Sequence, residues 1–263
     1  MTETSSAPYA APALEKGLDI LELLAREGRP MGTRQIAELL GRSKNEIFRM
    51  LHVLLARGYL QRDPLTETLS LSNSLFDLGM RTTRARNLVS VAAPVIERLA
   101  QDLRQAVHLV VAHRGETVII AATSGGTDLN FALRLGYRRP LVDAHSGLVL
   151  LAHQSPSEQA RMLDECFALT QSPVGMPALQ AELARVKAAG HIIAESRDIV
   201  GLTDLCCPIL AADGSALACV TLVAVTRRSA PPDFPALLAQ IEAAARQIRE
   251  EMGQMPLIEE GLA

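Results

Sequence analysis

The feature that most constrains the fold is a Ser-Lys-Asn-Glu sequence at residues 43–46, directly before a helical run of apolar residues. A serine followed three residues later by glutamate forms a capping box, which satisfies free N–H groups at the start of a helix. Gly41 ends the helix before it, so only Gly41 and Arg42 separate the two helices. Two helices on so short a turn predict a helix-turn-helix. The second helix places these apolar residues on one side: Ile47, Met50, Leu51, Leu54 and Leu55.

The residues before this motif predict two helices. Residues 14–27 carry leucines at every third or fourth position, and Gly28 ends the pattern. Thr33 is expected to cap a second helix, which continues to Leu40. The residues expected to be buried in these two helices are Leu14, Leu18, Leu21, Leu24, Ala25, Ile36, Ala37, Leu39 and Leu40.

A hairpin is expected after the motif. Two short strands at 59–62 and 68–71 flank an Asp-Pro dipeptide, which is a turn signal. A hairpin in this position is a wing. Residues 13–74 are therefore predicted to form a winged helix-turn-helix domain, preceded by a disordered Ser/Ala/Pro-rich tail at residues 1–12.

Positive charge gathers in this part of an acidic chain. The whole protein carries a formal charge of -3, but residues 29–62 contain seven Arg and Lys against two acids. In a helix-turn-helix, the start of the second helix enters the DNA major groove, where Arg, Lys and Asn read base edges. The alternative to DNA binding is that these basic side chains are solvated and have no partner. Ser43 is expected mainly to cap the helix and only secondarily to contact a phosphate. The candidate DNA-binding residues are Arg34, Arg42, Ser43, Lys44, Asn45, Arg49 and Arg62.

Composition limits the remaining classes of protein. The longest apolar run, residues 216–225, is about half the ~20 residues that a membrane helix needs. The N-terminus has no basic segment followed by an apolar one, so no export signal is expected. The four cysteines contain no Cys-x-x-Cys pair, which favours a reduced, cytoplasmic protein.

The second part of the chain alternates helices and strands at uneven spacing. Residues 75–90 are expected to form an exposed linker helix, and residues 91–255 a mixed α+β domain. Within it, helices are expected at 91–103, 146–153, 156–166, 178–189 and 234–252. Strands are expected at 106–111, 117–121, 129–135, 192–194, 204–210 and 216–225.

Catalytic and metal-binding patterns are weak. Asp143, His145 and Ser146 lie close together, but sequence neighbours cannot form the relay that a nucleophile needs, and the chain has no Gly-x-Ser-x-Gly. His108 and His113 are expected on opposite faces of a strand, which argues against a metal pair. The sequence therefore predicts no catalytic residues, no metal and no cofactor.

Several motifs in order resemble the IclR family of bacterial transcriptional regulators. They read LEKGLDILELLAREGRPMGTRQIAELLGRSKNEIFRMLHVLLARGYLQRD, LSNSLFDLG, AVHLVV, LRLGYRRPL, SGLVLLA and GHIIAESRDIVGL, and the resemblance covers roughly residues 14–252. It implies a winged helix-turn-helix, a linker helix and a GAF-like α+β domain that binds a small effector, here a small organic or aromatic acid. It also implies a homodimer or homotetramer on a pseudo-palindromic double-stranded DNA operator.

The resemblance also implies positions for the effector pocket. This chain departs from the family where a Cys is common, because Asp204 stands there, and Cys206 and Cys207 replace two alanines. The residues at family pocket positions are Phe131, Arg139, His145, Ser146, Ala194, Asp204, Thr221 and Val223. Two other functions stay open: a small-molecule-binding enzyme with an accessory DNA-binding domain, and a sensor that pairs with a protein partner.

Overall fold

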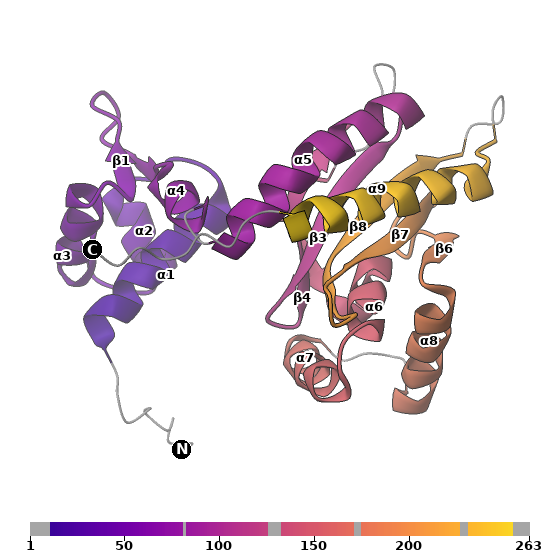
Figure 1. Ribbon diagram of the computed structural model, residues 1–263. Helices are drawn as coiled ribbons and strands as arrows, with labels where there is room; N and C mark the ends of the chain where they lie inside the picture. The colour runs from indigo at the N-terminus through magenta and orange to yellow at the C-terminus, as the bar shows by residue number, and fades with distance from the viewer. Residues whose placement is uncertain (1–10, 81–82, 126–132, 171–174, 227–230, 255–263) are drawn as a thin grey trace. The chain divides into compact units, whose positions relative to one another are not determined.

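The computed structural model describes residues 11–80, 83–125, 133–170, 175–226 and 231–254, and the chain divides into two compact units. Unit 1 is Met1–Arg86 and unit 2 is Asn87–Ala263 (Figure 1). Unit 1 contains a helix-turn-helix and unit 2 is a mixed α+β domain. No helix in the described residues is long and apolar enough to cross a membrane.

Unit 1 consists of short helices and one hairpin. Its elements are α1 (Pro12–Glu27), α2 (Thr33–Leu39), α3 (Lys44–Ala56), β1 (Leu60–Arg62), β2 (Leu69–Leu71) and α4 (Ser74–Met80). The predicted capping box is confirmed, because the Glu46 N–H donates to Ser43 Oγ at 3.3 Å and the Ser43 N–H donates to the Glu46 carboxylate at 2.8 Å. Gly28 ends α1 at φ 63°, a left-handed conformation that favours glycine.

The buried face of these helices differs from the expectation at several positions. Leu14, Leu18 and Leu39 were expected to be buried and are 63%, 48% and 52% exposed. The first half of α1 extends past the core, which α1 reaches only through Ile20 and its neighbours. Thr33 does not cap α2, because Gly32 occupies the cap position and no side chain bonds there. The core of unit 1 is Ile20, Leu23, Leu24, Met31, Ile36, Ala37, Ile47, Leu51, Leu60 and Leu69.

The predicted hairpin is confirmed and is fixed to the rest of unit 1. β1 and β2 pair antiparallel, with Leu60 opposite Leu71. Met31 and Leu69 exchange two backbone hydrogen bonds of 2.9 and 2.8 Å, which tie the hairpin to the segment before α2. At the turn, the Asp63 carboxylate accepts hydrogen bonds from the N–H groups of residues 65 and 66. These bonds lower the pKa of Asp63.

Unit 2 is built on a six-stranded antiparallel sheet with the order β5-β4-β3-β8-β7-β6. Its strands are β3 (Ala106–His113), β4 (Glu116–Thr123), β5 (Arg138–Pro140), β6 (Ile192–Glu195), β7 (Leu202–Leu210) and β8 (Ala216–Val225). Its helices are α5 (Thr83–Leu103), the 3-10 turn η1 (Leu141–Asp143), α6 (His145–Ala152), α7 (Pro156–Leu169), α8 (Met176–Ala189) and α9 (Phe234–Gln254).

Two predicted elements are placed differently. The third strand was expected at 129–135, but residues 133–135 are not in a strand, and β5 occupies Arg138–Pro140 instead. Residues 129–132 lie outside the described part of the chain. The linker and the helix after it were expected to be separate, yet α5 runs without interruption from Thr83 to Leu103 and contains Pro94.

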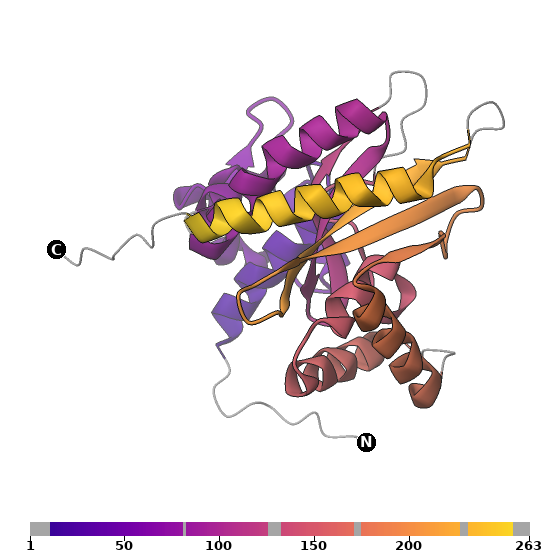
Figure 2. The same ribbon diagram turned by 45° about the vertical axis from the view of Figure 1, so that its right-hand side comes forward.

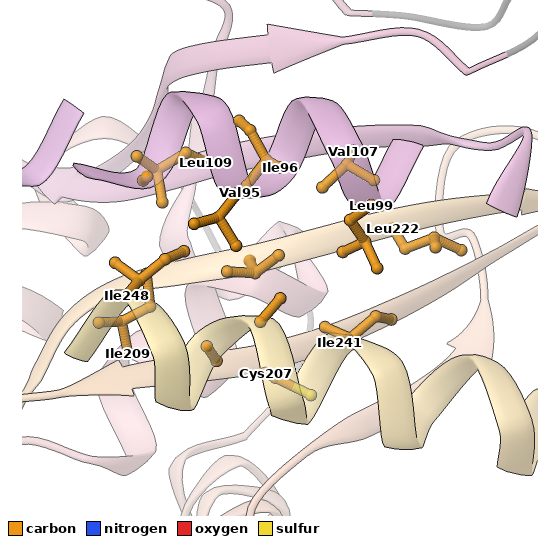
Figure 3. Packing of buried hydrophobic residues seen from close by; sticks show 14 of the residues in the cluster. Val95, Ile96, Leu99, Val107, Leu109, Cys207, Ile209, Leu222, Ile241 and Ile248 are labelled. Carbon is orange, nitrogen blue, oxygen red and sulfur yellow. The ribbon is translucent and has the colours of Figure 1, made fainter. Parts of the chain in front are cut away.

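The sheet separates two apolar cores. α5 and α9 lie side by side on one face (Figure 2), where they pack on alternate residues of β3, β7 and β8. Figure 3 shows this layer, with Leu99 of α5 beside Leu222 of the sheet and Ile241 on the neighbouring helix α9. On the other face α6 packs against the sheet, and α7 and α8 flank it. All four cysteines are free, buried thiols in unit 2.

Candidate functional site

The start of α3 is held rigidly by its capping box. The Ser43 hydroxyl and backbone N–H both donate to the Glu46 carboxylate, at 2.9 and 2.8 Å. Lys16 of α1 lies 3.4 Å from the same carboxyl group. The hydrogen bonds from Ser43, with the contribution of Lys16, lower the pKa of Glu46 to about 2. Ser43 is therefore a cap, as expected, and its hydroxyl is already engaged within the protein.

Three of the candidate DNA-binding residues are ion-paired within unit 1. Arg34 lies 2.8 Å from Glu38, and Arg62 lies 2.6 Å from Glu67 on the wing. Arg42 is half-buried and donates to Asp19 of α1 at 2.9 Å, so it joins the turn to the first helix. The sequence did not reveal this pairing, because the two residues lie 23 positions apart.

The other candidates face solvent on one side of α3. Lys44, Asn45 and Arg49 are exposed, whereas Ile47 and Leu51 on the opposite side are buried. Among the described residues, neither Lys44 nor Arg49 has an ion-pair partner. The exposed side of α3 thus presents two free cations and an amide beside the N-terminus of a helix.

Unit 2 contains a pocket on the face of the sheet that α6 covers. The space between its lining residues, together with the open solvent at its mouth, amounts to about 670 Å³. Six of the eight predicted positions line it: Arg139, His145, Ser146, Asp204, Thr221 and Val223. Ala194 faces a neighbouring hollow beside α8, although it pairs with Asp204 across β6 and β7. Phe131 lies outside the described residues.

An acid and an imidazole meet in this pocket. His145 Nδ1 lies 2.9 Å from Asp204 Oδ2, and the two side chains are only 6% and 19% exposed. β7 supplies Asp204, and the first turn of α6 supplies His145. Thr221 stands on the adjacent strand β8, and its hydroxyl lies 3.6 Å from the sulfur atoms of Cys206 and Cys219.

The N-terminus of α6 opens onto the pocket. Ala144 precedes the helix and has no side chain that could accept a hydrogen bond from its first N–H groups. Ala144, His145 and Ser146 all line the cavity. Gly147 lets the helix approach η1, because a Cβ on it would lie 2.1 Å from the carbonyl oxygen of Leu141. This turn therefore offers backbone donors and the positive end of a helix dipole to a ligand.

His108 is a pocket residue that the sequence reasoning missed. It lies on β3 opposite Thr221 and is 1% exposed. Its Nε2 accepts a hydrogen bond of 3.1 Å from the N–H of Leu133. Burial lowers the pKa of His108 to about 4, although the Asp204 charge opposes the shift. The ring is therefore neutral near pH 7. Alternation along the strand was the signal that could have found it, since His108 shares a sheet face with Thr221.

A segment between β6 and β7 lines the mouth of the pocket. Asp198 lies 3.5 Å from Arg139, which reaches the cavity from β5. Arg197 donates to the carbonyl oxygen of Val142 at 2.8 Å and to Glu182 of α8 at 2.7 Å. These contacts fix the segment to both sides of the opening.

The pocket contains part of a catalytic geometry. His145 and Asp204 form an imidazole–carboxylate pair, as in a hydrolase relay. Within the described residues, however, no hydroxyl or thiol is hydrogen-bonded to His145, and Ser146 follows it on the same helix. The described residues also contain no cluster of three His, Cys, Asp or Glu side chains that could hold a metal ion.

Family models match both units of the chain. The IclR helix-turn-helix domain matches residues 13–64, and the C-terminal domain of the bacterial transcriptional regulator IclR matches residues 80–250. The HTH-type transcriptional repressor AllR of Klebsiella pneumoniae is 24% identical over 95% of this chain and 93% of its own length. The HTH-type transcriptional regulator KdgR of Escherichia coli is 25% identical, over 94% of both chains.

Solved structures show the same fold. An IclR homologue from Microbacterium hydrocarbonoxydans, complexed with 4-hydroxybenzoate, has a TM-score of 0.78 at 22% identity and covers 92% of this chain and 100% of that one. An IclR transcriptional regulator from Alicyclobacillus acidocaldarius has a TM-score of 0.76 at 21% identity, with coverage of 93% and 100%.

Proposed function

The chain belongs to the IclR family of bacterial transcriptional regulators, and on this premise we propose that a small hydroxylated aromatic or organic acid switches its binding to DNA. The pocket formed by the His145–Asp204 pair and the open N-terminus of α6 carries the proposal. It offers both a hydrogen-bond acceptor and hydrogen-bond donors to such a molecule.

The acid group of the ligand is assigned to the positive side of the pocket. The first turn of α6 presents N–H groups there, and Arg139 reaches the cavity from β5. A carboxylate close to Asp204 would instead meet a like charge, which is costly in a buried site. The hydroxyl group is therefore assigned to Asp204, which can accept its hydrogen bond.

Apolar residues suit the body of the ligand. Val110, Ile119, Leu133 and Val223 also line the cavity. A small ring that carries polar groups suits this mixture of apolar and polar lining residues. The 4-hydroxybenzoate bound by the structural relative from Microbacterium hydrocarbonoxydans is a molecule of this class.

The DNA contact is assigned to the exposed side of α3. Lys44, Asn45 and Arg49 would read base edges in the major groove, while the exposed Arg34 and Arg62 would contact the phosphate backbone. Ser43 and Arg42 would act indirectly, by holding the start of α3 in place. We assign the protein to the cytoplasm as a homodimer or homotetramer. Two-fold symmetry of the protein then implies a pseudo-palindromic operator.

Catalysis is not part of the proposal. The relatives named as repressors regulate transcription, and His145 has no nucleophile hydrogen-bonded to it within the described residues. We assign DNA binding to residues 13–74 and effector binding to unit 2, which begins at Asn87.

One experiment tests both halves of the proposal. The full-length protein selects duplexes from a pool of random DNA, and fluorescence anisotropy then measures its affinity for the selected duplex with added 4-hydroxybenzoate, benzoate or phenol. We expect 4-hydroxybenzoate to change the affinity most, because benzoate lacks the group for Asp204 and phenol lacks the group for α6. Failure to enrich any sequence contradicts DNA recognition. An enriched duplex whose affinity none of the three compounds alters contradicts the ligand class alone.

A further inference from the structure

Phe48 stands on the exposed side of α3 and is 64% exposed. It follows Lys44 by four residues and Asn45 by three, and Arg49 follows Asn45 by four, so these four side chains share one exposed surface of the helix. Ile47 and Leu51 supply the buried side, and Phe48 is not among the residues packed against the core of unit 1. A large aromatic ring is therefore left in water among two cations and an amide.

The surroundings of Phe48 indicate what covers it. An apolar ring between side chains of positive charge does not suit an apolar protein surface, because the cations would have to be buried with it. The major groove suits the whole set. Phosphates can neutralise Lys44 and Arg49, base edges can bond Asn45, and the C5-methyl group of thymine offers an apolar contact.

We propose that Phe48 is a specificity-determining residue that recognises a thymine by contact with its methyl group. The inference rests on the proposed DNA-binding function. It adds recognition of one base through an apolar contact, which the polar residues of α3 do not provide. The contribution of this contact to specificity is expected to equal that of one buried methyl group, roughly fourfold in affinity.

The test compares base preference in the full-length parent, Phe48→Ala and Phe48→Leu. Each protein selects duplexes from the same random pool. We expect the parent to prefer thymine at one position in each half-site, Phe48→Ala to show no preference between thymine and the other bases there, and Phe48→Leu to keep part of the preference. Phe76→Ala is the matched control, because Phe76 is 66% exposed on α4, and it should leave every base preference unchanged.

A second measurement isolates the methyl group. Deoxyuridine replaces that thymine in the duplex selected by the parent, which removes the methyl group and retains base pairing. The parent should bind this duplex roughly fourfold more weakly, whereas Phe48→Ala should bind both duplexes equally. Circular dichroism confirms that the variants are folded.

Three outcomes overturn the inference in distinguishable ways. Equal base preferences and equal deoxyuridine penalties in the parent and Phe48→Ala exclude the thymine contact and leave the DNA-binding function intact. Unchanged preferences with a changed sedimentation coefficient in Phe48→Ala show that the ring contacts a second copy of the chain instead. If the parent enriches no sequence at all, the inference fails together with the proposed function.

Discussion

Asp204 uses one of its two carboxylate oxygens to bond His145, and in the described part of the chain the other oxygen has no hydrogen-bond partner. An unpaired carboxylate oxygen in a half-closed pocket accepts a hydrogen bond from a ligand without losing one inside the protein. Asp204 therefore gives the pocket a free hydrogen-bond acceptor.

Replacing Asp204 with alanine should weaken the binding of 4-hydroxybenzoate. A hydrogen bond to a charged group contributes about 1.5–3 kcal/mol, so we expect that loss in calorimetry. Glu195→Ala is the control for charge, since Glu195 is exposed on the neighbouring strand β6 and does not line the pocket. Parental affinity in Asp204→Ala would remove this carboxylate from the binding contacts.

His108 should make the protein less stable in mild acid. Its pKa is about 4 in the folded protein, below the ordinary value of 6.5, because burial favours the neutral ring. Between these values the unfolded chain binds the proton and the folded chain does not. Stability is therefore fully present above pH 6.5 and is lost as the pH falls toward 4, by at most about 1.4 kcal/mol per pH unit.

Urea denaturation between pH 7 and 5 measures this effect in the parent and in His108→Gln. Glutamine does not titrate, and it can accept the hydrogen bond from Leu133 that His108 accepts. The variant should therefore lose less stability than the parent across this range. Parallel pH profiles for the two proteins would show that His108 titrates normally.

The sequence predicted residues with a known position in a family motif and missed those defined by distant contacts. Asp204 and His145 reached the same pocket as expected. His108 was missed because its role depends on Leu133, 25 residues away. Arg42 was assigned to DNA, but its ion pair with Asp19 depends on how α1 crosses the helix-turn-helix, which no local pattern specifies.

At the scale of elements, α3 combines a first turn fixed by hydrogen bonds with an exposed side. Ser43 and Glu46 fix its first turn, so the side chains of the next two turns have defined directions. The short-range signals in this region were strong enough to predict α3, the turn before it and the wing. Residues 133–135 of the strand expected at 129–135 are not in a strand, because an apolar run resembles a strand whether or not a partner lies beside it.

Arginine substitutions on α3 and on the wing should have different effects on DNA binding. Arg49→Ala should relax base preference and weaken binding to the selected duplex, because Arg49 is exposed beside Asn45 without an ion-pair partner in the described residues. Arg62→Ala should weaken binding to all sequences alike and reduce the slope of log affinity against log salt by about 1.

Selection from random DNA and salt titrations of anisotropy distinguish the two arginines. Arg185→Ala is the control, because Arg185 is an exposed arginine on α8 of the other unit, with a side chain 78% exposed. It should bind as the parent does. If Arg49→Ala and Arg62→Ala both retain parental affinity for selected and random duplexes, α3 and the wing do not contact DNA in the proposed way.

At the scale of the whole molecule, the boundary between the two units falls within α5. The units divide after Arg86, whereas α5 begins at Thr83. Leu88 and Val91, in the first half of this helix, are already part of the core of unit 2. The expected effector domain began at residue 91, which would exclude Leu88 from its own core.

A fragment of residues 83–254 should therefore fold alone and bind 4-hydroxybenzoate without binding DNA. A fragment of residues 91–254 should be less stable, because it lacks Leu88, whose burial contributes about 2 kcal/mol. Thermal unfolding followed by circular dichroism compares the two. A longer fragment that shows no cooperative transition at micromolar concentration would indicate that unit 2 depends on the rest of the chain.

The location of the cysteines has a practical consequence. All four are buried in unit 2, and residues 1–86 contain none. Burial raises the pKa of Cys207, and a hydrogen bond with Cys219 together with burial raises that of Cys206, so these thiols remain protonated and unreactive while the unit is closed. Alkylation by iodoacetamide, followed by mass spectrometry, thus records the opening of the effector unit in the unlabelled, full-length protein. The measurement also works on the DNA-bound protein, and the helix-turn-helix contributes no signal.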